Sequence, residues 1–312
     1  MEVFGPVPSR RLGQSLGINN VPAKTCTYSC VYCQLGRTKK MQQKREKFYE
    51  PSVMKKRVNK LVTEKKENGE KIDYITFVAD GEPTLDASLG ETIDLLKDLN
   101  IKIAVISNSS LISSSKLRSE LNRADWVSLK CDAASEDVWR RVDRPRGGLK
   151  LTAIKEGILK FSRDYTGVLA TETMLVNGVN DSREEIEKIG EFISRVNPDI
   201  SFVAIPTRPP AEEWAKGPAP EKINMAVQIF KEKGINTEYL IGYEGNQFSS
   251  TGDIERDLLN ITAVHPLQEQ AVEKLIEKCE ADWKDVEKLI DEKKIIVTVF
   301  NDSKYYMRNI NN

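Results

Sequence analysis

Residues 25–33 read Thr25-Cys26-Thr27-Tyr28-Ser29-Cys30-Val31-Tyr32-Cys33, and this stretch carries the strongest signal in the chain. It places three of the five cysteines within eight positions, spaced C-x3-C-x2-C. A single buried cysteine behaves as a small apolar residue and can sit anywhere in a core. Three thiolates on one short loop can instead converge on one soft metal centre, which would be zinc, Cu(I) or an iron–sulfur cluster.

The number of available ligands separates these metal centres. Structural zinc takes four nitrogen or sulfur ligands, and the remaining candidates here, His265, Cys131 and Cys279, are remote in sequence. Iron–sulfur clusters are held by cysteine thiolates, and three cysteines leave one iron for a ligand that is not protein. The pattern therefore favours a cluster, with a zinc knuckle or a redox-active group of cysteines as the alternative.

Composition bounds the class of protein. The chain has 312 residues, of which 39% are hydrophobic, and its 47 basic residues balance its 47 acidic ones. This is enough for one large domain with a small second one. No apolar run reaches the roughly 18 residues of a membrane span, and the N-terminus lacks the apolar core of a secretion signal. An odd number of cysteines, three of them clustered, is typical of an intracellular metal site rather than a disulfide framework. We therefore expect a cytoplasmic protein with no membrane partner.

The C-x3-C-x2-C spacing, with aromatic Tyr32 before the last cysteine, resembles the cluster motif of the radical S-adenosylmethionine (SAM) superfamily. A second element, Gly81-Glu82-Pro83 after a β-rich run, resembles the superfamily's Gly-Glu-Pro element. The resemblance implies a [4Fe-4S] cluster whose open iron is chelated by SAM. The residues implied to hold the cluster are Cys26, Cys30 and Cys33. Those implied to bind SAM are Tyr32 at the adenine, Gly81 and Glu82 at the methionyl amine, and Asn108, Asp132 and Glu172 at the ribose or carboxylate.

Each SAM-binding assignment has a plainer alternative. Gly81-Glu82-Pro83 can be an ordinary Gly-Pro turn, and Asn108 and Asp132 can be cap or turn residues. Glu172 lies inside an apolar run, where an acid is costly unless it is partnered. It can therefore be an interior acid satisfied by an arginine.

Strands and helices alternate along the chain, which predicts an α/β fold with parallel strands and right-handed crossovers. Strands are expected at 15–21, 73–79, 101–106, 126–130, 168–176, 200–206 and 238–241, after an extended, turn-rich opening. Helices are expected at 52–68, 88–99, 113–122, 135–141, 150–163, 183–196 and 219–233. The last but one should begin with a capping box between Ser182 and Glu185. The superfamily resemblance implies that these units form a partial (β/α)6 TIM-type barrel over residues 1–250.

The C-terminal part has a different pattern. Residues 242–252 have the composition of a linker. Helices are expected at 253–260, 266–279 and 283–292, followed by β runs at 295–300 and 304–308, which predicts a small winged-helix-like module over residues 251–312. Its net charge is −4, which argues against binding phosphates. We expect it to pack on the barrel or bind protein, with Trp283 and Leu289 in its core.

Basic residues suggest where a substrate binds. Arg10 and Arg11 in the opening segment could clamp a phosphate or carboxylate, since each guanidinium is a planar fork of donors. Lys130 follows a predicted strand at the edge where ligands gather. The segment Arg144-Pro145-Arg146 resembles a loop in the wyosine-synthase-like branch of radical SAM proteins. Residues 34–71 carry a net charge of +8, which could steer a polyanion or simply be a solvated face.

The function expected is that of a radical SAM enzyme. It would cleave SAM reductively to a 5′-deoxyadenosyl radical that abstracts hydrogen from a substrate, with tRNA or a protein as candidates. An electron donor such as ferredoxin or flavodoxin is implied. The wyosine-base synthase carries a second cluster on another cysteine triplet, which this sequence lacks. The alternatives are an activase of a glycyl-radical enzyme or a peptide-modifying enzyme, and a non-catalytic, metal-stabilised winged-helix regulator.

Overall fold

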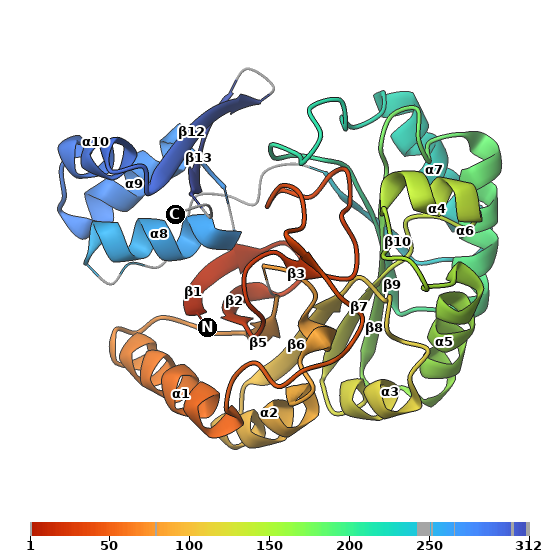
Figure 1. The fold of residues 1–312 in the computed structure, drawn as a ribbon, viewed down its shortest axis with the longest axis horizontal. Coiled ribbons are helices and arrows are strands. Elements are labelled where there is room, and N and C mark those ends of the chain that lie inside the picture. Colours follow the sequence, from red (N-terminus) through yellow and green to blue (C-terminus); the bar gives the residue numbers. More distant parts are fainter. Residues whose placement is uncertain are drawn as a thin grey trace.

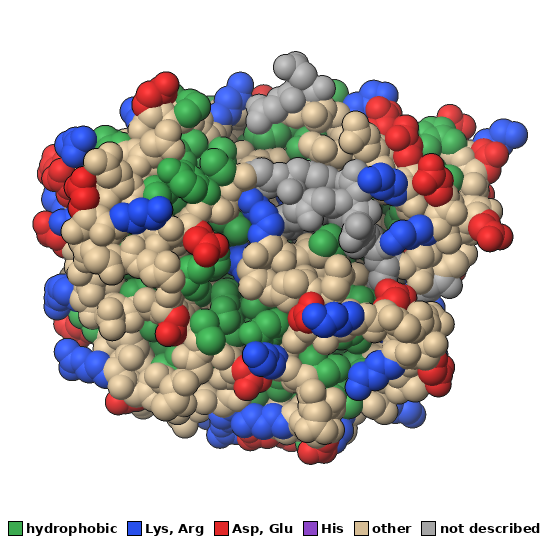
Figure 2. Space-filling model, turned by 180° about the vertical axis from the view of Figure 1, so that it is seen from behind, with side chains coloured by type: hydrophobic (Ala, Val, Ile, Leu, Met, Phe, Trp, Pro, Cys, Tyr) green, Lys and Arg blue, Asp and Glu red, His purple; other side chains and the backbone are tan. Residues whose placement is uncertain are grey.

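The computed structural model describes residues 2–78, 80–241, 250, 252–264, 266–300 and 303–309. Within these residues no helix is both long enough and apolar enough to cross a membrane. Lysines and arginines alternate with acidic side chains over the face seen in Figure 2, in keeping with the balanced net charge.

The centre of the molecule is an eight-stranded, mostly parallel sheet in the order β1-β2-β5-β6-β7-β8-β9-β10. Strand β1 pairs antiparallel with β2, and every other neighbouring pair is parallel. The strands are β1 (Glu2–Ser9), β2 (Gly13–Asn19), β5 (Tyr74–Phe77), β6 (Lys102–Ser107), β7 (Trp126–Lys130), β8 (Val168–Met174), β9 (Ile200–Ala204) and β10 (Thr237–Leu240). The expected α/β class is therefore confirmed.

The opening segment, expected to be extended and turn-rich, is a paired strand over residues 2–9, β1, followed by turns at 10–12. Prolines at 6 and 8 argue against a helix, but they do not prevent a strand at the edge of a sheet, where one side needs no partner. The pairing is irregular between Phe4 and Val7. Phe4 lies over Gly17 of β2, and a Cβ at Gly17 would come within 2.1 Å of the Phe4 ring.

Helices cover the outer side of this sheet, as Figure 1 shows. They are α1 (Pro51–Glu67), α2 (Leu89–Leu96), α3 (Ser115–Leu121), α4 (Glu136–Val142), α5 (Leu151–Asp164), α6 (Arg183–Val196) and α7 (Pro220–Glu232). Apolar residues recur on their inner faces; in α6, for example, Ile186, Ile189 and Ile193 are buried against the sheet. One cluster of buried side chains runs through all of these layers.

The predicted capping box at α6 is only half formed. Ser182 accepts a hydrogen bond from the Glu185 backbone N–H at 3.3 Å. The Glu185 carboxylate turns to α4 instead, where it accepts from Ala134 N at 2.7 Å and Ser135 N at 2.9 Å. These amides precede a helix N-terminus, which attracts a negative charge, and this contact replaces the one with Ser182.

A long connection joins β2 to α1 and contains the three-cysteine loop. It includes the short strands β3 (Thr25–Cys26) and β4 (Lys40–Met41), which pair in parallel. In Figure 1 it lies between the C-terminal helices and α4. Two short 3-10 helices lie elsewhere in the chain: Pro83–Leu85 between β5 and α2, and Lys97–Leu99 between α2 and β6.

The C-terminal part has its own buried cluster, which includes Leu258, Val272, Leu289 and Tyr306. Its elements are α8 (Ile254–Val264), β11 (Leu267–Gln268), α9 (Glu269–Cys279), α10 (Trp283–Asp291), β12 (Ile295–Phe300) and β13 (Ser303–Arg308), with strand order β11-β13-β12. Strand β11 was not predicted. Trp283 packs edge-on against Tyr306. Most of the linker predicted at 242–252, together with His265, lies outside the described residues.

Among the described residues, the C-terminal part contacts the rest of the chain through α8, which lies against β1, and through several single side chains. Val7 of β1 packs against its apolar cluster. Tyr305 Oη donates to the Thr207 carbonyl at 3.0 Å. Buried Lys65 of α1 donates to the carbonyl of Ser250, in the segment that leads to α8, at 3.0 Å. The C-terminal part therefore packs directly on the rest of the chain, as predicted.

Candidate cofactor site

All three clustered cysteines line one cavity of about 280 Å³ at the carboxyl ends of the parallel strands. Of the residues predicted to bind SAM or substrate, this lining also contains Arg10, Arg11, Tyr32, Gly81, Lys130 and Glu172. Ligands gather at this edge in parallel α/β folds because the loops there converge. The sequence thus places its sulfur ligands and several of its charged candidates around one space.

The cysteine loop takes its shape from the loop that follows α4. Ser29 N donates to the Asp143 carbonyl and Val31 N to the Val142 carbonyl, both at 3.0 Å, and Arg146 N donates to the Thr27 carbonyl at 2.9 Å. Tyr28 packs edge-on against Trp139 of α4, with ring centroids 5.9 Å apart. Backbone and aromatic contacts together hold the loop so that its thiols face the cavity.

Burial favours the neutral form of the three thiols in the protein without metal. It raises the pKa of Cys26 to about 12, and it also raises the pKa of Cys30 and Cys33. Within the described residues, no three histidine, cysteine or acidic side chains lie close enough together to hold one metal ion.

Gly81 and Glu82 occupy different positions. Gly81 lines the cavity, and its backbone packs so tightly that an added Cβ would lie 1.9 Å from the Thr25 carbonyl oxygen. Glu82 is buried and is not among the described side chains that line the cavity. Its carboxylate accepts hydrogen bonds from Thr84, from the Ser107 hydroxyl at 2.8 Å and from Asn108 N at 2.7 Å. Burial nevertheless raises its pKa.

Asn108 lies behind the first cysteine rather than in the cavity lining. Its side-chain amide donates to Thr27 Oγ1 at 2.8 Å and approaches Cys26 Sγ at 3.5 Å. It therefore joins the end of β6 to the cysteine loop.

Asp132 also lies beneath the cavity. It is buried, accepts a hydrogen bond from the Tyr32 hydroxyl, and accepts one from Met174 N at 2.7 Å. Asp143 is its neighbour, and Cys30 Sγ donates to Asp143 at 3.4 Å. Burial raises the pKa of both carboxyls. Tyr32 thus lines the cavity while its hydroxyl is held by the buried Asp132 carboxyl.

Glu172 faces the cavity between two cations. Arg11 and Lys130 both form ion pairs with its carboxylate. Burial opposes its ionisation, but the charges of Arg11 and Lys130 outweigh burial and lower the pKa to about 2. Lys130 in turn lies 5.2 Å from the centre of the Tyr32 ring. The plainer alternative for Glu172, an interior acid paired with an arginine, therefore describes its contact with Arg11.

The two arginines of the 144–146 loop lie outside the cavity lining. Arg144 pairs with Glu212, which also binds Arg37 Nε at 2.9 Å. Arg146 donates to the Met41 carbonyl at 2.7 Å. Sequence reasoning missed Lys24 and Arg208, which do line the cavity. Arg208 follows the end of β9 in the run Thr207-Arg208-Pro209, and that position was a usable signal.

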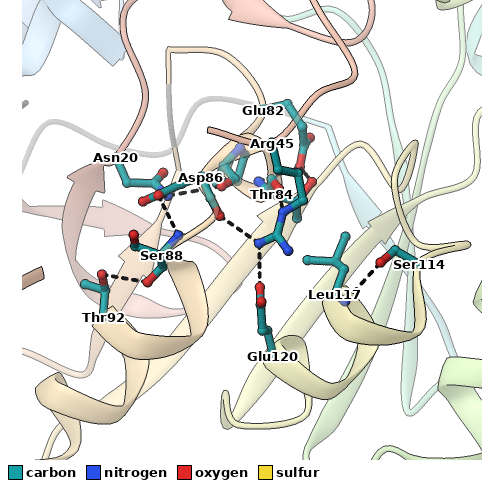
Figure 3. Close-up of polar contacts among 11 residues, drawn as sticks. Asn20, Arg45, Glu82, Thr84, Asp86, Ser88, Thr92, Ser114, Leu117 and Glu120 are labelled. Atoms are coloured by element: carbon teal, nitrogen blue, oxygen red, sulfur yellow. Dashed lines mark hydrogen bonds and ion pairs between the residues drawn. The ribbon is translucent and has the colours of Figure 1, made fainter. Parts of the chain in front are cut away.

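A third missed residue is Arg45, which contacts the segment just after Gly81-Glu82-Pro83 from the side away from the cavity (Figure 3). It donates to the Thr84 carbonyl at 2.8 Å and the Asp86 carbonyl at 2.7 Å, and it pairs with Glu120 of α3. Asn20, after β2, donates to the Pro83 carbonyl at 3.0 Å and to Asp86 at 3.2 Å. The loop is thus held by the segment on either side of the cysteines.

Comparison with known proteins identifies a family and several relatives of this chain. A family model described as the radical SAM superfamily matches residues 20–193. The UPF0026 protein MJ1312 of Methanocaldococcus jannaschii is 43% identical over 309 residues, covering 98% of this chain and 96% of that protein. A UPF0026 protein of Helicobacter pylori strain J99 is 36% identical over 214 residues, covering 66% of this chain and 67% of the relative.

Two solved structures share the fold at low sequence identity. TYW1 with a lysine–pyruvate adduct bound aligns with a TM-score of 0.54 and 16% identity, covering 71% of this chain and 75% of the other. A radical SAM methyltransferase from Sphaerobacter thermophilus aligns with a TM-score of 0.53 and 16% identity, covering 73% and 66%. At this identity the likeness concerns the fold alone.

Proposed function

We propose that this chain, which belongs to the radical SAM superfamily, abstracts a hydrogen atom from an anionic substrate, for which RNA is the leading candidate. Members of the superfamily are enzymes, and its cofactors are a [4Fe-4S] cluster and SAM. When bound, these cofactors supply reductive cleavage of the sulfonium bond and a 5′-deoxyadenosyl radical. The protein supplies binding, orientation and exclusion of water.

One observation carries the proposal: three thiols converge on a single cavity whose other walls carry Gly81 and the Arg11–Glu172–Lys130 ion pairs. Cys26, Cys30 and Cys33 would hold the cluster as thiolates. A cluster with three protein ligands leaves one iron for SAM.

The remaining residues would hold SAM or position the residues that do. Gly81 would present backbone to the methionyl amine, since a side chain there has no room. Tyr32 would lie against the adenine. Glu172 would face the ribose or methionyl group, with Arg11 and Lys130 fixing its charge. Glu82, Asn108 and Asp132 would position the residues that bind SAM rather than touch SAM themselves. Their polar side-chain atoms already form hydrogen bonds with neighbouring segments of the site.

An anionic substrate is supported by the charge of the cavity wall. Five cationic residues line it, namely Arg10, Arg11, Lys24, Lys130 and Arg208, against the carboxylates of Asp80 and Glu172. Arginine forks match phosphate and carboxylate oxygens. Lys24 and Lys39 also repel each other: burial, and then Lys39, lower the pKa of Lys24. Lys39, of the basic 34–71 segment, therefore lies next to a residue of the cavity wall, and its N–H donates to the Lys24 carbonyl at 3.1 Å.

The domain organisation is also part of the proposal. We place a partial barrel over residues 1–250 and a winged-helix-like module over 251–312. The module's order, α8-β11-α9-α10-β12-β13, is the order of helices and strands in a winged helix.

Assignment to the wyosine-synthase-like branch is an inference from the 144–146 loop. An electron donor such as ferredoxin or flavodoxin and a cytoplasmic setting would suit the cluster.

The test is anaerobic reconstitution with iron and sulfide, followed by SAM and a reductant. We expect a brown protein with about four irons per chain that forms 5′-deoxyadenosine. Cys30→Ser should lose both the colour and the product, whereas Cys279→Ser, in the C-terminal part, should keep both. A colourless wild-type protein that purifies with zinc would refute the cluster. A brown protein that binds SAM without forming 5′-deoxyadenosine would instead favour the regulator.

A further inference from the structure

A groove of about 500 Å³ lies outside the cofactor cavity, between α4 and the loops that follow β8 and β9. Three arginines line it: Arg140, Arg141 and Arg144. Trp214 forms another part of the wall, and no carboxylate is among the described residues of the lining. An indole and several guanidinium groups around one groove provide a stacking surface beside positive charge.

Trp214 is unusual among the tryptophans in its exposure. Half of it is open to solvent, whereas Trp126 and Trp139 are only 4% and 2% exposed. Its segment is nevertheless held in place: Glu212 N donates to the Val31 carbonyl at 3.0 Å, and Asn177 N donates to the Lys216 carbonyl at 2.9 Å. An exposed aromatic ring on a fixed backbone loses little conformational freedom when a ligand stacks on it.

The three arginines differ in how strongly their charges are neutralised. Arg140 pairs with Glu136 across one turn of α4 at 2.7 Å, and both side chains are about half exposed. Arg144 shares Glu212 with Arg37. Arg141 donates to the neutral Gly178 carbonyl at 3.0 Å, with no described carboxylate within ion-pair distance. Exposed ion pairs are weak, so Arg140, which also lies 5.6 Å from the centre of the Trp139 ring, can exchange Glu136 for a phosphate at little cost. Arg141 would give up only a hydrogen bond to a neutral carbonyl.

We propose that this groove binds single-stranded nucleic acid, with a base stacked on Trp214 and the adjoining phosphates on Arg140 and Arg141. Proteins that bind unpaired strands combine aromatic platforms with a basic groove in this way. The groove lies beside the cysteine loop, because the segment of Trp214 is bonded to Val31. A strand seated there would pass along the flank of the cofactor cavity. The inference therefore gives the substrate class of the proposed enzyme, although the binding itself needs neither cluster nor SAM.

The test is a fluorescence-anisotropy titration of the full-length protein without cofactors. The probes are a labelled oligouridylate of roughly ten nucleotides, within the range bound by a single site, its oligothymidylate counterpart, and an acidic peptide of equal charge. The variants are W214A, W214F and the double variant R140Q/R141Q. R183Q is the control, because Arg183 forms a similar exposed ion pair on α6.

We expect saturable binding of the oligonucleotides that weakens with salt. W214A should weaken it roughly tenfold, and W214F should stay within roughly threefold of wild type, since a ring remains for stacking. The double variant should reduce the slope of log affinity against log salt by roughly 0.7 per arginine, and R183Q should change nothing. Tighter binding of the oligouridylate would identify the bound strand as RNA, and tighter binding of the oligothymidylate would identify it as DNA.

Non-saturable binding of both oligonucleotides would overturn the proposal, and so would equal affinity of W214A and wild type at unchanged circular dichroism. Tighter binding of the acidic peptide than of the oligonucleotides would assign the groove to a protein partner and would also overturn it. Failure of 5′-deoxyadenosine formation would leave these titrations unaffected, so the two proposals fail separately.

Discussion

Glu172 shows how one interior carboxylate is kept ionised. Its two partners come from different parts of the chain, Arg11 from the turn after β1 and Lys130 from the end of β7. Each cation would be costly to bury alone, and the carboxylate between them offsets that cost. The ion pairs therefore fix three side chains of the cavity wall at once.

The lowered pKa of Glu172 predicts a specific dependence of stability on pH. A carboxyl whose pKa falls from about 4.3 in the unfolded chain to about 2 in the folded protein stabilises the fold above the unfolded value. That stability is lost as pH falls toward 2. Glu172→Gln should therefore lower the free energy of unfolding by roughly 3 kcal/mol at pH 7, and the difference from wild type should shrink between pH 4 and pH 2.

Urea unfolding of both proteins at several pH values measures this difference. Glu184→Gln is the control, because Glu184 pairs with Lys188 on the exposed face of α6, and it should show no measurable change. A difference for Glu172→Gln that stays constant down to pH 2 would contradict the ionised state.

Among the elements, the Gly-Glu-Pro loop depends most on close backbone contact. Gly81→Ala would push a Cβ into the Thr25 carbonyl, so the cysteine loop or the Gly-Glu-Pro loop must move. We expect a loss of roughly 3 kcal/mol or more and a reconstituted protein with less iron. Gly147→Ala is the control, since a Cβ there meets nothing within 4 Å. Equal stability and equal iron content in the two variants would show that the contact does not constrain the site.

Arg45 offers a second test of the same loop, from its outer side (Figure 3). Arg45→Gln removes a charge that binds two carbonyls and the nearly buried Glu120. We expect a loss of about 3 kcal/mol, because Glu120 is left without its partner, together with weaker SAM binding by calorimetry. Arg123→Gln, which removes an exposed pair with Asp94, should cost under about 1 kcal/mol. If SAM affinity is unchanged in Arg45→Gln, the brace is structural only.

The sequence predicted elements well where the pattern was periodic. The helix predicted at 183–196 matched α6, although its capping box formed only in part, and the β-rich runs matched the parallel strands. Strand β1 was missed because Pro6 and Pro8 suggested a loop. Among site residues, the cysteines and Gly81 face the cavity as expected. Glu82, Asn108 and Asp132 do not, because a side chain at a strand end can turn inward or backward, and only its tertiary partners decide which.

At the scale of the whole molecule, the C-terminal part rests on β1 through Val7. Val7→Asp would place a charge in that apolar contact, and we expect a loss of roughly 2 kcal/mol. Val53→Asp on α1, where the side chain is 45% exposed, is the control and should be nearly neutral. Differential scanning calorimetry measures both. A Val7→Asp protein that melts like wild type would show that this contact contributes little to the fold.

The bracing of the cysteine loop by the segment after α4 has a consequence for biosynthesis. The partners of Ser29 and Val31 are Asp143 and Val142, which leave the ribosome long after the cysteines do. Contacts between distant segments form slowly, because a long loop must first be closed. We therefore expect the three thiols to stay unarranged on the nascent chain until the segment around residues 142–146 has been made and has folded against them, so that iron and sulfide are inserted only after that stage.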